Sequence, residues 1–168
     1  MIRPNIRMLT IVFFLFIAPS FTSLAQEGLK AGTKAPGFEL PDINGNKVAL
    51  SSFSNKNIVV IHFWKSKWRE CQAEFPSLID LQEEIKQVKV LSINPIDLAD
   101  RVKAESASLG LPFDVLVGRD SNILTEYKVT KLPRVLIIGK KGTIVLTEKY
   151  ASYEKRKEEV EKALKKGL

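Results

Sequence analysis

Two runs of apolar, largely β-branched residues dominate the hydrophobic pattern of the chain. Residues 58–64 form the longer run, which only His62 interrupts, and residues 88–93 form the second. Continuous apolar runs of this length are typical of strands that are covered on both faces of a sheet. Shorter apolar segments at 135–138 and 143–146 predict two more strands. The pattern therefore predicts a sheet whose central strands are buried.

Turn residues between short apolar segments predict two hairpins. Asn44 and Gly45, which both tolerate positive φ, separate short strands expected at 38–40 and 47–50. A Gly-Lys-Lys-Gly turn at 139–142 joins the last two strands. The first hairpin is expected to form an extension before the main sheet.

Apolar residues recur at helical spacing after the first buried run. They are Cys71, Phe75, Leu78, Ile79 and Ile85. Pro76 lies inside this pattern and predicts a kink, because proline lacks a backbone donor and clashes one turn back. Further helices are predicted at 98–109 before Gly110, after an N-cap at Asp120, and after an N-cap at Ser152. Strands alternating with helices predict an α/β fold, with helices on both faces of a mixed central sheet.

The first 25 residues do not share this pattern. Arg3 and Arg7 precede an apolar run at 8–18, and Ser23-Leu24-Ala25 forms a small-x-small site. This layout is typical of a secretory signal peptide, and an uncleaved membrane anchor is the alternative. We therefore expect a signal at 1–25 followed by one domain at 26–168, in a periplasmic or secreted protein. Membrane association is expected only if the first segment is retained.

Charge and cysteine content narrow the function classes. The formal net charge is +7, to which the two leader arginines contribute, so the exported chain carries +5. This charge favours contact with acidic partners, but no nucleic-acid motif is present, and we expect no nucleic-acid partner. The single cysteine excludes an intramolecular disulfide. One histidine and one cysteine fall short of a zinc ligand set, so no metal or cofactor is expected.

Four stretches follow one another at the spacing of a known family. They are 35–40 with 44–48 (entry hairpin), 58–64 (central strand ending in Phe-Trp), 71–76 (Cys-Gln-Ala-Glu-Phe-Pro), and 132–145 (Leu-Pro, strand and last hairpin). Together they resemble the thioredoxin superfamily, and more closely its periplasmic TlpA/ResA-like branch, next to the redoxins (AhpC/TSA related) and peroxiredoxins. The resemblance covers the chain from about residue 32 onward. It implies a thioredoxin-like fold and a thiol–disulfide oxidoreductase ancestry tied to envelope redox homeostasis.

The family's Cys-x-x-Cys motif is degenerate in this chain. The matching residues are Trp68-Arg69-Glu70-Cys71, so Trp68 stands where the family has its nucleophilic cysteine, and Cys71 holds the resolving position. An indole cannot attack a disulfide. Ordinary dithiol catalysis is therefore not expected, and whether the protein is an enzyme stays open.

Cys71 has two interpretations. Its spacing to Phe75 and Leu78 places it on an inward helix face, which favours a buried and inert thiol. The alternative is an enzyme: a monothiol oxidoreductase or a one-cysteine peroxidase that acts through Cys71. Peroxidases of that family carry a threonine where this chain has Trp68. Glu74 matches an acidic residue that the family keeps near the dithiol, where the resemblance implies that it helps to move protons. With one thiol gone, we expect it instead to be a partly buried helix carboxylate paired with a lysine.

The resemblance also implies a groove between the 65–71 turn and the loop at Pro133, the family's cis-proline position. Cations are predicted on both walls around Trp68: Lys65, Lys67, Arg69, Lys128, Lys131 and Arg134. Tryptophan and arginine are favoured at interface centres. The hypothesis is a binding module, expected to be monomeric, that holds an acidic protein or peptide partner of the cell envelope. A solvated lysine-rich rim, with Trp68 plugging the groove, is the alternative.

Overall fold

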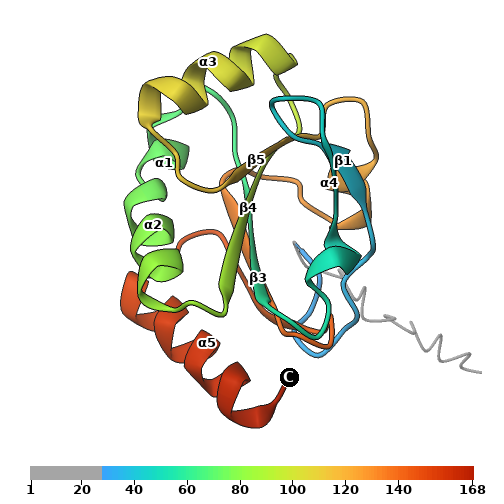
Figure 1. Cartoon of the computed structure of the whole chain (residues 1–168), viewed down its shortest axis with the longest axis vertical. Helices are drawn as coiled ribbons and strands as arrows, with labels where there is room; N and C mark the ends of the chain where they lie inside the picture. Colours follow the sequence, from blue (N-terminus) through green and yellow to red (C-terminus); the bar gives the residue numbers. More distant parts are fainter. Residues whose placement is uncertain (1–27) are drawn as a thin grey trace, which may run out of the picture.

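A five-stranded mixed sheet organises the computed structural model, which describes residues 28–168 (Figure 1). Its strand order is β5-β4-β3-β6-β7. The strands are β3 (Ile58–Phe63), β4 (Val88–Asn94), β5 (Asp114–Val117), β6 (Arg134–Ile138) and β7 (Ile144–Glu148). β3 runs parallel to β4 and antiparallel to β6. The predicted central strand is thus confirmed as the middle of the sheet.

A separate two-stranded hairpin precedes this sheet, as the Asn-Gly signal predicted. β1 (Glu39–Pro41) pairs with β2 (Lys47–Ala49), and a 3-10 turn, η1 (Leu50–Phe53), follows. Asp42 accepts amide hydrogen bonds from Asn44 and Asn46 at 2.7 and 2.8 Å, which closes the connecting loop. The remaining secondary-structure elements are helices.

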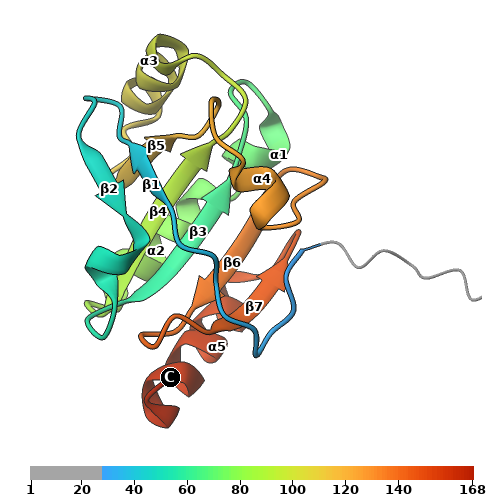
Figure 2. The same ribbon diagram turned by 90° about the vertical axis from the view of Figure 1, so that its right-hand side faces the viewer.

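Five helices complete the described residues. They are α1 (Arg69–Gln72), α2 (Phe75–Glu84), α3 (Ala99–Leu109), α4 (Ile123–Glu126) and α5 (Tyr153–Lys166). α2, α3 and α5 pack on one face of the sheet, and α4 packs on the other face together with the β1–β2 hairpin (Figures 1 and 2). Within residues 28–168, no helix is both long and apolar enough to cross a membrane. The predicted segment 1–25 lies outside the described residues.

Two of the three predicted helix caps are confirmed. The Ser152 hydroxyl accepts a hydrogen bond from the Lys155 amide, and Gly110 ends α3 in the left-handed conformation, as predicted. The predicted cap at Asp120 is wrong, because α4 begins after Asn122. Asp120 lies in the preceding turn, so its acceptor does not reach the first helical amides.

Pro76 interrupts the predicted helix. α1 ends at Gln72, and α2 restarts at Phe75 with Pro76 in its first turn. A proline there needs no backbone donor, so the restart avoids the clash of an interior proline.

Candidate functional site

Trp68 lies at the start of α1, directly beyond the end of β3. Its carbonyl accepts hydrogen bonds from the amides of Cys71 and Gln72 at 3.1 and 3.0 Å. Its indole is 43% exposed, and the ammonium nitrogen of Lys65 lies 4.7 Å from the ring centroid. This contact is a cation–π interaction, which fixes a positive charge beside the aromatic face.

Two carboxylates hold the turn that presents Trp68. Asp97 accepts the Ser66 amide at 3.0 Å, and Glu105 of α3 accepts the Lys67 amide at 3.1 Å. Burial alone would raise the pKa of Asp97, but its hydrogen bonds to Ser66, Asn94 and Arg101 bring that pKa below its usual value. Lys67 has a φ of 62°, which a lysine rarely adopts, and the hydrogen bond from its amide to Glu105 supports this conformation.

Cys71 is fully buried, as its helical position predicted. Its exposed fraction is 0%, and it packs in the core cluster that contains Phe75 and Leu78. Burial raises the pKa of the Cys71 thiol. A thiol with a raised pKa carries little thiolate at neutral pH, which makes it a poor nucleophile.

Glu74 forms a buried ion pair with Arg156 of α5. The prediction of a lysine partner is therefore wrong. Arg156 also donates to the Ser77 hydroxyl at 2.6 Å, so one planar guanidinium serves two acceptors on α2. This partner could not be predicted from local patterns, because 82 residues separate the two side chains.

His62 packs in the core on the same side of the sheet as Cys71, without bonding to it. Its ring makes an edge contact with Phe75 at a centroid distance of 5.1 Å, and its Nδ1 lies 3.5 Å from the Ser92 hydroxyl. Burial, with a smaller contribution from the positive charge of Arg156, lowers the pKa of His62 to about 3. His62 is thus a neutral packing residue at physiological pH, in line with its mid-strand position.

A groove of about 440 Å³ lies beside Trp68. It is lined by Lys65, Trp68, Ile96, Leu124, Val129, Thr130, Lys131, Leu132 and Lys149. Its residues come from the β3–α1 turn, the loop after β4, α4, the loop before β6 and the residue after β7. The Leu132–Pro133 peptide bond at its edge is cis, which confirms the prediction for Pro133. Trp68 lines this groove and does not fill it.

The predicted cations do not all reach the groove. Lys65 and Lys131 line it, whereas Lys67, Arg69 and Lys128 lie outside its lining. Arg134 is only 5% exposed, because it begins β6 beside Phe63, so the prediction of an exposed basic side chain there is wrong.

Lys149 is the groove cation that sequence reasoning missed. The β6–β7 register pairs Val135 with Glu148, the last residue of β7, so Lys149 directly after it lies at the same end of the sheet as the Pro133 loop. Extending the predicted last hairpin by three residues would have found it. Among residues 28–168, no cluster of His, Cys, Asp and Glu is suited to a metal ion.

Several solved structures have the same fold as this chain. One is a thiol:disulfide interchange protein from Bacteroides sp. (20% identity, TM-score 0.71), and the match covers 79% of this chain and 91% of that one. Another is the thioredoxin domain of a thiol-disulfide oxidoreductase from Bacteroides vulgatus (19% identity, TM-score 0.69, 82% and 97%). The fold is therefore thioredoxin-like.

Sequence comparison gives the family. The AhpC/TSA family model matches residues 31–147, and the chain belongs to this redoxin family. The thiol-disulfide oxidoreductase ResA of Bacillus subtilis (strain 168) is 27% identical over 146 residues, 86% of this chain and 81% of the relative. ResA of Bacillus thuringiensis subsp. konkukian is 29% identical over 143 residues, which cover 84% of this chain and 80% of that relative. The chain is thus a redoxin related to thiol–disulfide oxidoreductases.

Proposed function

We propose that this protein is an exported binding module that keeps the groove of a thiol–disulfide oxidoreductase but does not exchange thiols. The observation that carries the proposal is the contrast between Trp68 and Cys71. The indole is exposed in the groove, whereas the only thiol is fully buried. Contact with a partner is therefore available to Trp68 and not to the sulfur.

The groove's chemistry favours an acidic, extended peptide. Lys65, Lys131 and Lys149 supply positive charge around an apolar floor, and no aspartate or glutamate lines the groove. Trp68 adds a large face for packing against an apolar side chain. The cis bond before Pro133 supports the same assignment, since the family's substrates dock beside that proline through their backbones.

Peptide binding followed by tryptophan fluorescence tests the proposal. The probe is a short peptide in which Asp and Glu flank one leucine, and its Asn/Gln counterpart is the uncharged control. Trp64 is fully buried and Trp68 is exposed, so the signal is expected from Trp68 and disappears in Trp68→Phe. Binding should weaken as salt shortens the screening length from about 10 Å at 0.1 M to about 3 Å at 1 M.

Matched variants separate the groove from the thiol. Lys131→Glu/Lys149→Glu is expected to lose acidic-peptide binding, whereas Lys56→Glu/Lys86→Glu makes the same charge change outside the groove and should retain it. Cys71→Ser is also expected to bind normally. Loss of binding in Cys71→Ser alone would instead support the monothiol oxidoreductase or one-cysteine peroxidase alternative.

A further inference from the structure

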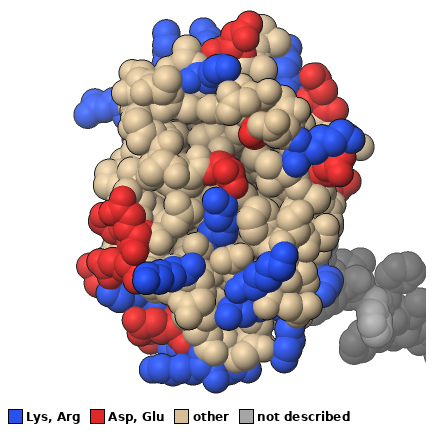
Figure 3. Space-filling model, viewed as in Figure 1, with Lys and Arg blue, Asp and Glu red and all other residues tan. Residues whose placement is uncertain are grey.

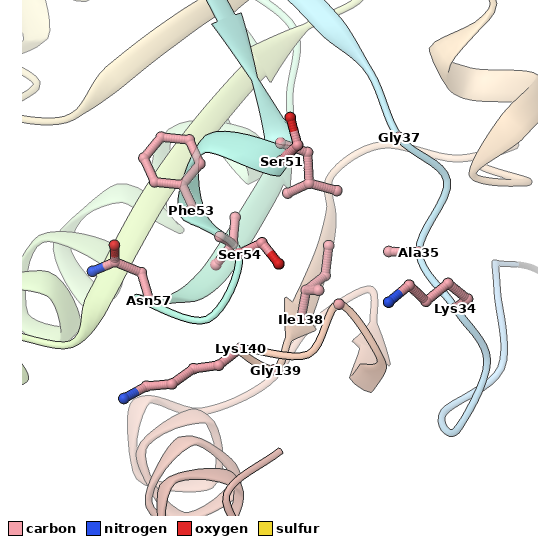
Figure 4. A pocket seen from close by; sticks show the side chains of 13 residues that line it. Lys34, Ala35, Gly37, Ser51, Phe53, Ser54, Asn57, Ile138, Gly139 and Lys140 are labelled. Carbon is pink, nitrogen blue, oxygen red and sulfur yellow. The ribbon is translucent and has the colours of Figure 1, made fainter.

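The large apolar side chains that are exposed within residues 28–168 all lie at the end of the sheet that carries the Trp68 groove. β3, β4 and β7 end there, because β4 runs parallel to β3 and β6 runs antiparallel to both of its neighbours. Trp68 follows β3, Ile96 and Leu98 follow β4, and Tyr150 follows β7, with exposed fractions of 43%, 40%, 63% and 54%. The cavity of about 240 Å³ at the other end of the sheet, shown in Figure 4, has none of them in its lining. Apolar surface gathered at one end is typical of a protein interaction site.

Leu98 occupies the N-cap of α3, where a leucine is unfavourable. Ser, Thr, Asp and Asn are preferred at an N-cap, because their side chains accept a hydrogen bond from the first-turn amides. Leu98 makes no such bond, and most of its side chain faces solvent. The loop before it is held by Asp97, which accepts hydrogen bonds from the Ser66 amide and the Asn94 side chain at 3.0 and 3.1 Å. Leu98 is thus presented at a fixed position where it does not serve the helix.

The two sides of this surface differ in charge. The strand order β4-β3-β6-β7 places Leu98 on one side of the groove and Tyr150 on the other. Next to Leu98, Asp100 lies in the first turn of α3, and the Arg101 guanidinium pairs with Asp97 at 3.4 Å. The β4 side therefore offers apolar surface to a ligand, with a carboxylate beside it that disfavours an anion.

Cations lie on the opposite side, after β7. Lys149 lines the groove together with Lys131, and its ammonium nitrogen lies 5.1 Å from the ring centroid of Tyr150. The neighbouring Glu148 carboxylate is engaged in an ion pair with Lys155, so it does not neutralise Lys149. Lysines alone would not identify a site, since Lys and Arg side chains are spread over the face shown in Figure 3. Their separation from the exposed apolar side chains of the β4 side distinguishes this end of the sheet.

We propose that the partner of this surface is a protein segment with apolar residues at one end and acidic residues at the other. Its apolar end lies on Ile96 and Leu98, its middle passes Trp68, and its acidic end reaches Lys131 and Lys149. β4 and β7 are three strand spacings apart, about 14 Å, which about four or five residues of an extended chain cover. This placement rests on the proposed function of the groove and adds the direction in which the partner lies.

The probe is a peptide with two leucines at one end, two acidic residues at the other and two serines between them, which carries a nitroxide label at either end. In NMR spectra of the protein, the label at the leucine end is expected to broaden the amide signals of Ile96 and Leu98 most strongly. The label at the acidic end should instead broaden those of Lys149 and Tyr150. Equal broadening of both pairs by each label, or the opposite assignment, would overturn the proposal.

Leu98→Ser separates binding from stability. Serine is a better N-cap than leucine, so this variant should melt at the same temperature as wild type or higher. It should nevertheless bind the probe about fivefold or more weakly, because the apolar contact is lost. Ala104→Ser, at an exposed position later in α3, is the matched control and should keep the affinity. Wild-type affinity in Leu98→Ser contradicts the proposed direction.

The short acidic peptide with one leucine distinguishes a wrong direction from a wrong function. If that peptide binds wild type while the labelled probe shows no direction, or while Leu98→Ser leaves the affinity of the probe unchanged, only the direction is wrong. If neither peptide binds wild type, the proposed function of the groove fails as well.

Discussion

Arg156 of α5 and Glu74 at the start of α2 form a buried ion pair that ties the C-terminal helix to the helix that follows the degenerate Cys-x-x-Cys motif. Glu74 is the residue that matches the family's acidic group near the dithiol. Here its charge is engaged by Arg156, whose second nitrogen bonds Ser77. The carboxylate therefore has a structural role that fits a site without thiol exchange.

Breaking this pair is expected to destabilise the fold. Arg156→Met leaves a buried carboxylate without its partner, which costs about 3–5 kcal/mol in the free energy of unfolding. Lys157→Met, which removes the exposed ion pair with Glu84, is the matched control and should cost much less. Urea denaturation measures both. Equal losses in the two variants would show that the buried pair has no special role.

Adding Glu74→Leu to Arg156→Met should recover much of the lost stability, because no uncompensated charge then remains in the core. Failure to recover would assign the loss to packing of the arginine stem and not to the ion pair.

Acid should destabilise the protein through His62. Its pKa is lowered to about 3 in the folded state from a usual value of 6.5, so below pH 6.5 the unfolded chain binds a proton that the folded chain does not. Stability is therefore fully present above pH 6.5 and falls with the pH toward 3, by about 2 kcal/mol at pH 5. Urea denaturation at pH 7 and pH 5 measures this loss.

His62→Leu tests whether His62 causes this dependence of stability on pH. It replaces the ring with an apolar side chain on the face that contacts Phe75 and removes the titrating group. The variant should lose much less stability between pH 7 and pH 5 than wild type. The same loss in both proteins would place the acid sensitivity elsewhere.

The sequence predicted the parts of the fold that rest on local patterns. Continuous apolar runs located β3 and β4, and the residues around Pro133 predicted its cis bond. β5 was missed, since it contributes only four residues and its central pair, Val115 and Leu116, is too short to stand out. Short edge strands depend on their neighbour for hydrogen bonds more than on their own pattern.

The candidate site was predictable only where one element decides a residue's position. Trp68 and Cys71 follow from the start of one helix, so their contrasting exposure could be anticipated. The Arg156 partner of Glu74, and the burial of Arg134, depend on how distant elements pack. A lysine and an arginine are equivalent in a charge pattern, but only the three-dimensional packing shows which one is inside.

Cys71 should react slowly with thiol reagents. Because it is buried and its pKa is raised by that burial, labelling at neutral pH should be at least about 100-fold slower in the folded protein than in denaturant. Trp68→Cys/Cys71→Ser moves the only thiol to the exposed position and should label quickly. Fast labelling of wild-type Cys71 without denaturant would contradict a buried, inert thiol.

The reduction of insulin disulfides, measured as turnover in the presence of a small-molecule reductant, tests the central claim most directly. Wild type and Cys71→Ser are both expected to match the reductant alone, because the residue at the nucleophile position is Trp68. Trp68→Cys, which restores Cys-x-x-Cys at 68–71, should gain activity if the surrounding scaffold is intact. Turnover by wild type that disappears in Cys71→Ser would contradict the account and identify the protein as a monothiol enzyme.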